Sequence, residues 1–132
     1  HSIDAKGRLA VPARFRAQFE RGGIITQGLE RCLQVFPTET WERKARELAA
    51  TNLEMRLRRY LERVLFGTAE PCELDAQGRI VLPLKLRRYA ELQGEALVLG
   101  AHERVEIWQP GQWNAYLEEM RGEDLSALQL PF

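Results

Sequence analysis

One unusual phrase occurs twice in this chain. It reads IDAKGRLAVPARFR over residues 3–16 and LDAQGRIVLPLKLR over residues 74–87. The residues that recur at an offset of 71 are Asp4 and Asp75, Gly7 and Gly78, Arg8 and Arg79, and Pro12 and Pro83. Core packing alone does not reproduce an Asp, a Gly-Arg pair and a Pro at fixed spacing. The repeat therefore restricts the chain to folds built from two equivalent halves.

The repeat continues beyond this phrase. Near Gly94 the second copy gains one residue, and an offset of 72 then aligns CLQVF (32–36) with RVEIW (104–108) and Trp41 with Trp113. Each half is predicted to run hairpin, short helix, strand, strand, helix. We expect residues 1–66, which carry a helical insertion, and residues 67–132 to be the two halves of one intertwined domain, because 132 residues suffice for one compact domain.

A tight turn is predicted at the centre of each phrase. In Asp4-Ala5-Lys6-Gly7 the Asp carboxylate can accept a bond from an N–H two residues on, and Gly tolerates positive φ. Pro12 and Pro83 suit the first helical position. The predicted elements are strands at 2–9, 73–81, 24–27, 95–99, 32–36 and 104–108 and short helices at 12–19 and 83–92.

Two further helical segments follow the strands. Thr38 is expected to cap a helix that buries Trp41, and Thr51 with Glu54 to form a capping box for the next helix. An apolar stripe on that helix is interpreted as core or a subunit contact, and comprises Leu53, Leu57, Tyr60, Leu61, Val64 and Leu65. Arg56, Arg59 and Arg63 lie on a separate face, interpreted as solvated or as a partner contact. The last helix starts near Pro110, with Trp113, Tyr116, Leu117 and Met120 inward.

The hairpins are too short to bury their own faces. Two copies that interleave into one closed sheet about a pseudo-two-fold axis would cover each other and remove exposed strand edges. The predicted fold is therefore α+β, a swapped-hairpin β-barrel of two interlocked repeats with flanking helices.

Charge is distributed unevenly although the formal net charge is zero. Residues 1–16 carry four basic side chains against Asp4, and residues 74–89 carry four against Asp75. Residues 91–124 carry eight carboxylates against two arginines. Each basic patch thus coincides with one copy of the repeated phrase, which favours an anionic partner.

Sequence signatures of enzymes and cofactor sites are missing. The two histidines stand alone, no Gly-x-Ser-x-Gly elbow, P-loop or dinucleotide fingerprint occurs, and Cys32 and Cys72 lack metal-ligand spacing. We expect no catalysis, no cofactor, no metal and no small-molecule substrate. No apolar run approaches the ~18 residues of a membrane span. A cytoplasmic protein with reduced cysteines is predicted.

Arg8 is expected to project from the rim of its turn. A guanidinium held there can contact a guanine edge through two hydrogen bonds, while Lys6, Arg14 and Arg16 contact phosphates. The alternative is that Asp4 and Arg8 only pair with each other across the hairpin, and the residues alone leave both open.

The two Asp-x-x-Gly-Arg phrases and the helices between them closely resemble the MraZ family of bacterial proteins, which have the AbrB-like swapped-hairpin fold. The resemblance implies a sequence-specific, nucleoid-associated regulator of transcription that binds direct repeats in the promoter of the division and cell-wall gene cluster. It also implies double-stranded DNA and ring-like homo-oligomers as partners. The family's DNA-contacting motif corresponds here to Asp4, Lys6, Gly7 and Arg8, and to Asp75, Gly78 and Arg79.

One difference between the copies is that Gln77 in the second copy stands where the first copy has Lys6.

A second interpretation of the same fold remains: an antitoxin-like protein-interaction module that docks a partner through the helical stripe.

Overall fold

A computed structural model describes residues 1–132 and contains two antiparallel sheets. The smaller sheet pairs β1 (Arg8–Ala10) with β5 (Arg79–Val81). The larger has the order β4-β2-β3-β7-β6, with β4 (Glu70–Cys72), β2 (Gly23–Gln27), β3 (Leu33–Pro37), β7 (Val105–Trp108) and β6 (Leu97–Gly100).

Helices follow the strands in the predicted order. They are α1 (Ala13–Arg16) with a 3-10 turn η1 (Ala17–Phe19), α2 (Thr38–Ala50), α3 (Met55–Leu61) with a π-helical turn η2 (Glu62–Phe66), α4 (Leu84–Tyr89) and α5 (Pro110–Arg121). The α+β class is confirmed. No helix combines the length and the apolar character that crossing a bilayer requires.

The two halves are related by a pseudo-two-fold axis that passes through both sheets. Leu9 of β1 faces Ile80 of β5, its equivalent at an offset of 71, and Gln34 of β3 faces Glu106 of β7, its equivalent at 72. Equivalent residues face each other only where a two-fold axis runs between them. The repeat in the sequence is therefore a repeat in space.

The halves are also interlocked. The strand that leads into the second turn, β4, pairs with β2 of the first half, where Cys72 faces Gly23. The segment that leads into the first turn pairs with the second half, where the Ala96 N–H donates to the carbonyl of His1 at 2.9 Å. Each hairpin is thus completed by residues of the other half.

The expected single closed sheet is wrong, because the strands form two separate sheets. The hydrogen-bond ladder between β1 and β5 ends at Val11 and Leu82, whose N–H groups donate to the carbonyls of Gly78 and Gly7 in the opposite turn. The next residues are Pro12 and Pro83, which have no N–H to continue it.

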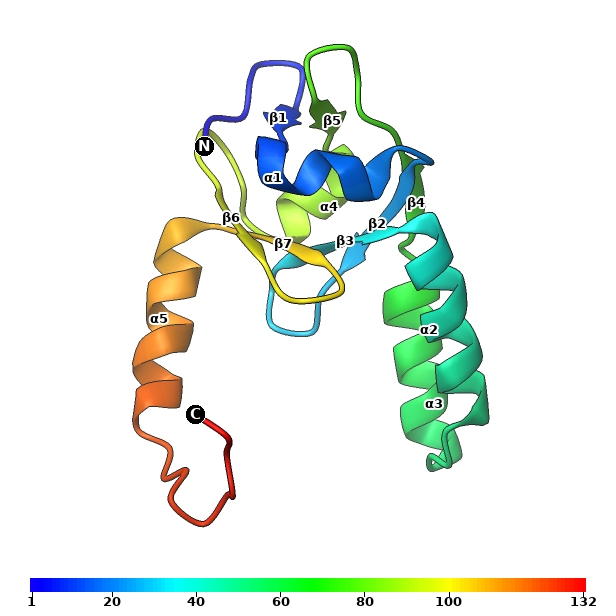
Figure 1. Ribbon diagram of the computed structural model, residues 1–132, viewed down its shortest axis with the longest axis vertical. Coiled ribbons are helices and arrows are strands. Elements are labelled where there is room, and N and C mark those ends of the chain that lie inside the picture. The colour runs from blue at the N-terminus through cyan, green and yellow to red at the C-terminus, as the bar shows by residue number, and fades with distance from the viewer.

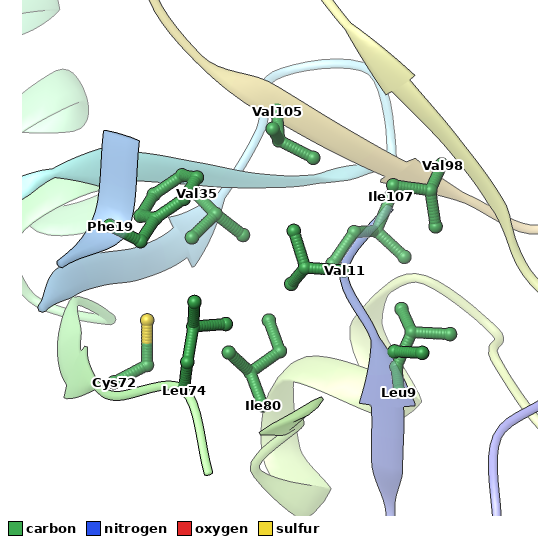
Figure 2. A pocket seen from close by; sticks show the side chains of 11 residues that line it. Leu9, Val11, Phe19, Val35, Cys72, Leu74, Ile80, Val98, Val105 and Ile107 are labelled. Atoms are coloured by element: carbon green, nitrogen blue, oxygen red, sulfur yellow. The ribbon is translucent and has the colours of Figure 1, made fainter. Parts of the chain in front are cut away.

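Apolar side chains fill the space between the two sheets (Figure 2). Leu9 and Val11 reach toward Val105 and Ile107 of the large sheet. The space left among them is about 10 Å³ and is lined only by hydrophobic residues, which is close to the least volume that holds one water molecule. The small sheet, and the turns that it carries, therefore rest on a tightly packed base.

Both cysteines are free: Cys32 is buried and Cys72 half-buried. Burial raises the pKa of the Cys32 thiol to about 12 and that of the Cys72 thiol to about 11.

Two helical arms extend from the large sheet, on the side away from the turns (Figure 1). The first consists of α2 and α3, and the second is α5. Equivalent aromatic pairs hold their bases: the rings of Phe36 and Trp41 are 5.4 Å apart, and those of Trp108 and Trp113 are 5.1 Å apart. Equivalent aromatic contacts thus position both arms on the large sheet.

The predicted helix caps are wrong. Thr38 is the first residue of α2 rather than its cap, and its hydroxyl donates to the carbonyl of Arg21. The Thr51 hydroxyl donates back to the carbonyl of Glu47 at 2.7 Å, so it closes the end of α2 and makes no box with Glu54. Pro12 and Pro83 immediately precede their helices instead of starting them.

The apolar stripe of the first arm does not belong to the core of the chain. Leu57 and Tyr60 are 43% and 55% exposed, and the other members are only half-buried. Arg58 fastens α3 to α2 by donating to the carbonyls of Leu48 and Thr51 at the end of α2. The interpretation of the stripe as core is therefore wrong, and the subunit contact stays a prediction. In the second arm, Trp113, Tyr116 and Leu117 are half-buried, while Met120 is exposed.

Candidate nucleic-acid interface

The two repeated turns stand next to each other at one end of the molecule, above the small sheet (Figure 1). The first turn closes with a bond of 2.9 Å from the Gly7 N–H to the Asp4 carbonyl. Oδ1 of Asp4 accepts from the N–H of Lys6 at 3.0 Å and from that of Arg8 at 2.9 Å. One carboxylate oxygen thus organises the backbone of the whole turn.

The second turn repeats this geometry. Gly78 bonds to the Asp75 carbonyl at 2.9 Å, and Oδ1 of Asp75 accepts from the N–H groups of Gln77 and Arg79, both at 2.9 Å. Gly7 and Gly78 have φ of +79° and +73°, values that L side chains rarely adopt. The predicted roles of the Asp and the Gly in the turn are confirmed in both copies.

The second oxygen of each Asp holds the arginine. Oδ2 of Asp4 lies 2.6 Å from Nε of Arg8, and Oδ2 of Asp75 lies 2.9 Å from Nε of Arg79. The pairing that the sequence left as an alternative therefore forms in both copies. It uses only Nε, so Nη1 and Nη2 of Arg8 make no hydrogen bond within the chain. Pairing and presentation are compatible: the carboxylate aims the guanidinium and leaves its outer edge free.

These bonds lower the pKa of both carboxyls. The N–H of Arg8 and then its guanidinium hold the pKa of Asp4 below its usual value, and the N–H and guanidinium of Arg79 do the same for Asp75. Both groups therefore stay ionised at neutral pH and keep their arginines in place.

An ion pair links the two turns. Nη1 of Arg79 lies 3.9 Å from Oδ2 of Asp4, so Arg79 lies near two carboxylates, whereas Arg8 pairs with one. The side chains of Arg8 and Arg79 are 32% and 28% exposed. Both arginines thus face solvent from adjoining positions.

The remaining predicted residues occupy different places. Lys6 is exposed on the first turn. Arg14 is exposed on α1, with its guanidinium 4.8 Å from the ring centre of Phe15. Arg16 does not lie with Arg8, as its place in the first phrase suggests, but against Gly78 of the second turn. Interlocking carries α1 across to the other half's hairpin.

Sequence reasoning missed Arg87. This side chain lies against Gly7 of the first turn, and its Nε donates to the Leu82 carbonyl at 2.9 Å. The signal was available, since Arg87 is the equivalent of Arg16 at an offset of 71. No group of three or more His, Cys, Asp or Glu side chains is placed to hold a metal ion.

Comparison with known proteins identifies the family. The family model described as "MraZ protein, putative antitoxin-like" matches residues 1–64 and again residues 65–129. The chain belongs to the MraZ family. The double match also confirms the repeat.

Three relatives are named transcriptional regulator MraZ. That of Thermomicrobium roseum is 43% identical over 98% of this chain and 91% of its own length. That of Roseiflexus castenholzii is 44% identical over 91% and 84%, and that of Moorella thermoacetica is 46% identical over 90% and 83%. The chain is therefore a member of a family of transcriptional regulators, and neither comparison indicates an enzyme family.

Proposed function

We propose that this protein regulates transcription by binding double-stranded DNA in a sequence-specific manner through its paired turns. The observation that carries the proposal is the locked arginine of each turn, whose Nε is held by an Asp; both outer nitrogens of Arg8 are free, and one outer nitrogen of Arg79 lies 3.9 Å from Asp4. A guanidinium that offers two donors in fixed geometry suits the O6 and N7 acceptors of guanine.

The shape of this end of the molecule favours the major groove. The two turns are carried by a two-stranded sheet, β1 and β5, and project from this end of the molecule (Figure 1). The major groove of B-DNA admits a two-stranded ribbon. Lys6 lies on the first turn, Arg16 and Arg87 lie against the turn glycines, and Arg14 is exposed on α1. These side chains would contact phosphates, which add affinity without reading sequence.

The proposed target is a set of direct repeats in the promoter of the bacterial division and cell-wall gene cluster. Several copies of the chain, arranged in a ring, would each present one pair of turns to successive repeats. Linked contacts that are individually weak then give high overall avidity.

The exposed faces of the arms support self-association. The stripe on α3, with Leu57 and Tyr60 exposed, is flanked by arginines, whereas α5 carries Glu118 and Glu119. Opposite charges around apolar faces suit a contact between neighbouring copies. Light scattering of the wild type and of Leu57→Glu/Tyr60→Glu tests this contact. We expect the wild type to have a mass that is a multiple of the chain mass, and the variant to have a lower mass. An unchanged mass would exclude this face as the contact.

The DNA proposal is tested by gel shifts and fluorescence anisotropy on a duplex from upstream of the protein's own coding sequence, against a scrambled duplex. We expect preference for the first duplex and a steep loss of affinity with salt, because phosphate contacts release counterions. Arg8→Ala/Arg79→Ala should remove the preference while the circular dichroism melting curve is retained. A folded double variant that still distinguishes the duplexes would refute the proposal.

A second candidate is an antitoxin-like module that binds another protein through the α3 stripe. The uncovered stripe and the wording of the family description favour it. It predicts that the wild type binds neither duplex, or binds both with equal affinity and little dependence on salt. The salt series therefore separates the two candidates.

A further inference from the structure

Two arginines cross from one half of the repeat to the turn of the other half. A Cβ atom placed on Gly7 would lie 2.9 Å from Cζ of Arg87, and one placed on Gly78 would lie 2.5 Å from Cζ of Arg16. Apart from their chain neighbours, no atoms lie closer to these two positions than those of the arginine side chains. Gly7 and Gly78 are both buried although they belong to exposed turns.

The crossing is fixed by hydrogen bonds on both sides. Nε of Arg87 donates to the carbonyl of Leu82, whose own N–H donates to the carbonyl of Gly7 at 2.8 Å. In the other half, Nε of Arg16 donates to Val11 at 2.8 Å, and the Val11 N–H donates to Gly78 at 2.9 Å. Each arginine is therefore tied to the turn that it covers through a single residue.

Arg16 and Arg87 are held by Nε alone, as Arg8 is. Their Nη groups make no hydrogen bond or ion pair within the chain. Unlike Arg8 and Arg79, they form no ion pair with a carboxylate. They cover the buried glycine of the turn rather than its exposed rim. A charged group set back from the rim of the turn suits a contact with a DNA phosphate and not with the base edges in the groove.

We propose that each half of the repeat supplies the phosphate-binding arginine for the other half's turn. Arg87 acts with Arg8, and Arg16 acts with Arg79; the arginine on the rim reads a base and the crossing arginine neutralises a phosphate beside it. The inference rests on the proposed DNA binding. Its distinctive consequence is that residues far apart in sequence form one functional unit, whereas Arg8 and Arg16 of the same phrase belong to two.

A double-mutant cycle on the upstream duplex tests this assignment. The variants are Arg8→Ala, Arg87→Ala and Arg16→Ala, with the pairs Arg8→Ala/Arg87→Ala and Arg8→Ala/Arg16→Ala. We expect the factors by which Kd rises to multiply for the Arg8–Arg16 pair. For the Arg8–Arg87 pair, the combined factor should differ from their product by at least about twofold, since Arg87 is linked through Leu82 to Gly7, the neighbour of Arg8, and residues that share one hydrogen-bond network couple.

Controls separate the charge from the fold. Arg88→Ala removes an exposed arginine one residue beyond Arg87 and should leave the cycle unchanged. Arg87→Gln removes the charge but keeps an N–H donor near Leu82, so it covers the case in which Arg87→Ala lowers the melting temperature. Removing one phosphate-binding side chain should reduce the slope of log Kd against log salt by about one. Light scattering should show that all variants share one oligomeric state.

The outcomes are distinguishable. Coupling of Arg8 with Arg16 instead of Arg87, or no coupling in either pair, overturns the crossed assignment while the wild type still prefers the upstream duplex. If the wild type shows no preference between the duplexes, the proposed function itself fails, and the crossed assignment fails with it.

Discussion

The two turns have nearly the same backbone but different electrostatic surroundings. In both, one Asp accepts two N–H groups and holds the following arginine by Nε. The first turn adds Lys6 where the second has Gln77, and Arg79 lies between two carboxylates where Arg8 pairs with one. Duplication has thus preserved the local chemistry of the turn while the charge around it has diverged.

The largest expected difference is between Arg8→Ala and Arg79→Ala. A base contact through two hydrogen bonds contributes ~1–3 kcal/mol, which is roughly a 5- to 150-fold change in Kd. We expect Arg8→Ala to lie near the upper end and Arg79→Ala near the lower, because Asp4 and Asp75 both compete with DNA for Arg79. Anisotropy on the upstream duplex measures both.

The matched control for this pair is Arg121→Ala, which removes an arginine at the far end of α5, well away from the turns (Figure 1). Equal losses of affinity in the two turn variants would mean that the added carboxylate has no influence.

The turn glycines give the next largest effect. Alanine at positive φ costs about 1–2 kcal/mol of unfolding free energy, and each added Cβ must also displace a guanidinium. Gly78→Ala should cost more than Gly7→Ala, because Arg16 approaches Gly78 more closely than Arg87 approaches Gly7. Urea denaturation measures the difference. Gly94→Ala is the control, because a Cβ there meets nothing within 4 Å, and a loss of stability as large as that of Gly78→Ala would contradict this explanation.

Exchanging the residue that distinguishes the turns should have a smaller effect. We expect Lys6→Gln to lower the slope of log Kd against log salt by about one, and Gln77→Lys to raise it by about one. The exchange leaves the Asp–Arg pairs untouched, so specificity should be retained. A change of specificity without a change of slope would show that Lys6 contacts a base.

The smallest expected effect is the pH dependence of the unfolding free energy. Because Asp4 and Asp75 have pKa values below the usual 3.8 in the folded chain, the stability that they add is complete above that pH and is lost as the pH falls through the folded values. Asp4→Asn and Asp75→Asn should each flatten the profile below about pH 4, because each carboxyl accepts the same three hydrogen bonds in its turn.

A control for this profile is needed because Glu103 titrates in the same direction. Lys44 and Arg43 bond to its carboxylate and lower its pKa to about 2. Glu103→Gln therefore removes a loss of stability at acid pH that does not belong to the turns. The loss of stability due to Glu103 is subtracted first. If Asp4→Asn and Asp75→Asn then leave the pH dependence of the unfolding free energy unchanged, the two turn carboxylates do not stabilise the fold.

The helix ends show where sequence reasoning falls short. Thr51 and Glu54 have the spacing of a capping box, yet the Thr51 hydroxyl bonds back to Glu47 and Arg58 takes the carbonyls at the end of α2. A spacing rule considers only residues three apart. Here the Thr51 N–H, to which Glu54 would bond in a capping box, instead donates to the Leu48 carbonyl at 3.1 Å, and the place of the following helix is set by tertiary packing.

The turns, the order of elements and the repeat could all be predicted from the amino-acid sequence. Those features depend on contacts within about four residues, such as the Asp4 carboxylate with the N–H groups of Lys6 and Arg8, and local chemistry is legible in a sequence. Three features could not be predicted in this way: the division into two sheets, the uncovered stripe on α3, and the exchange of turns between Arg16 and Arg87. These depend on how the halves interlock, which is set by packing between residues some seventy positions apart.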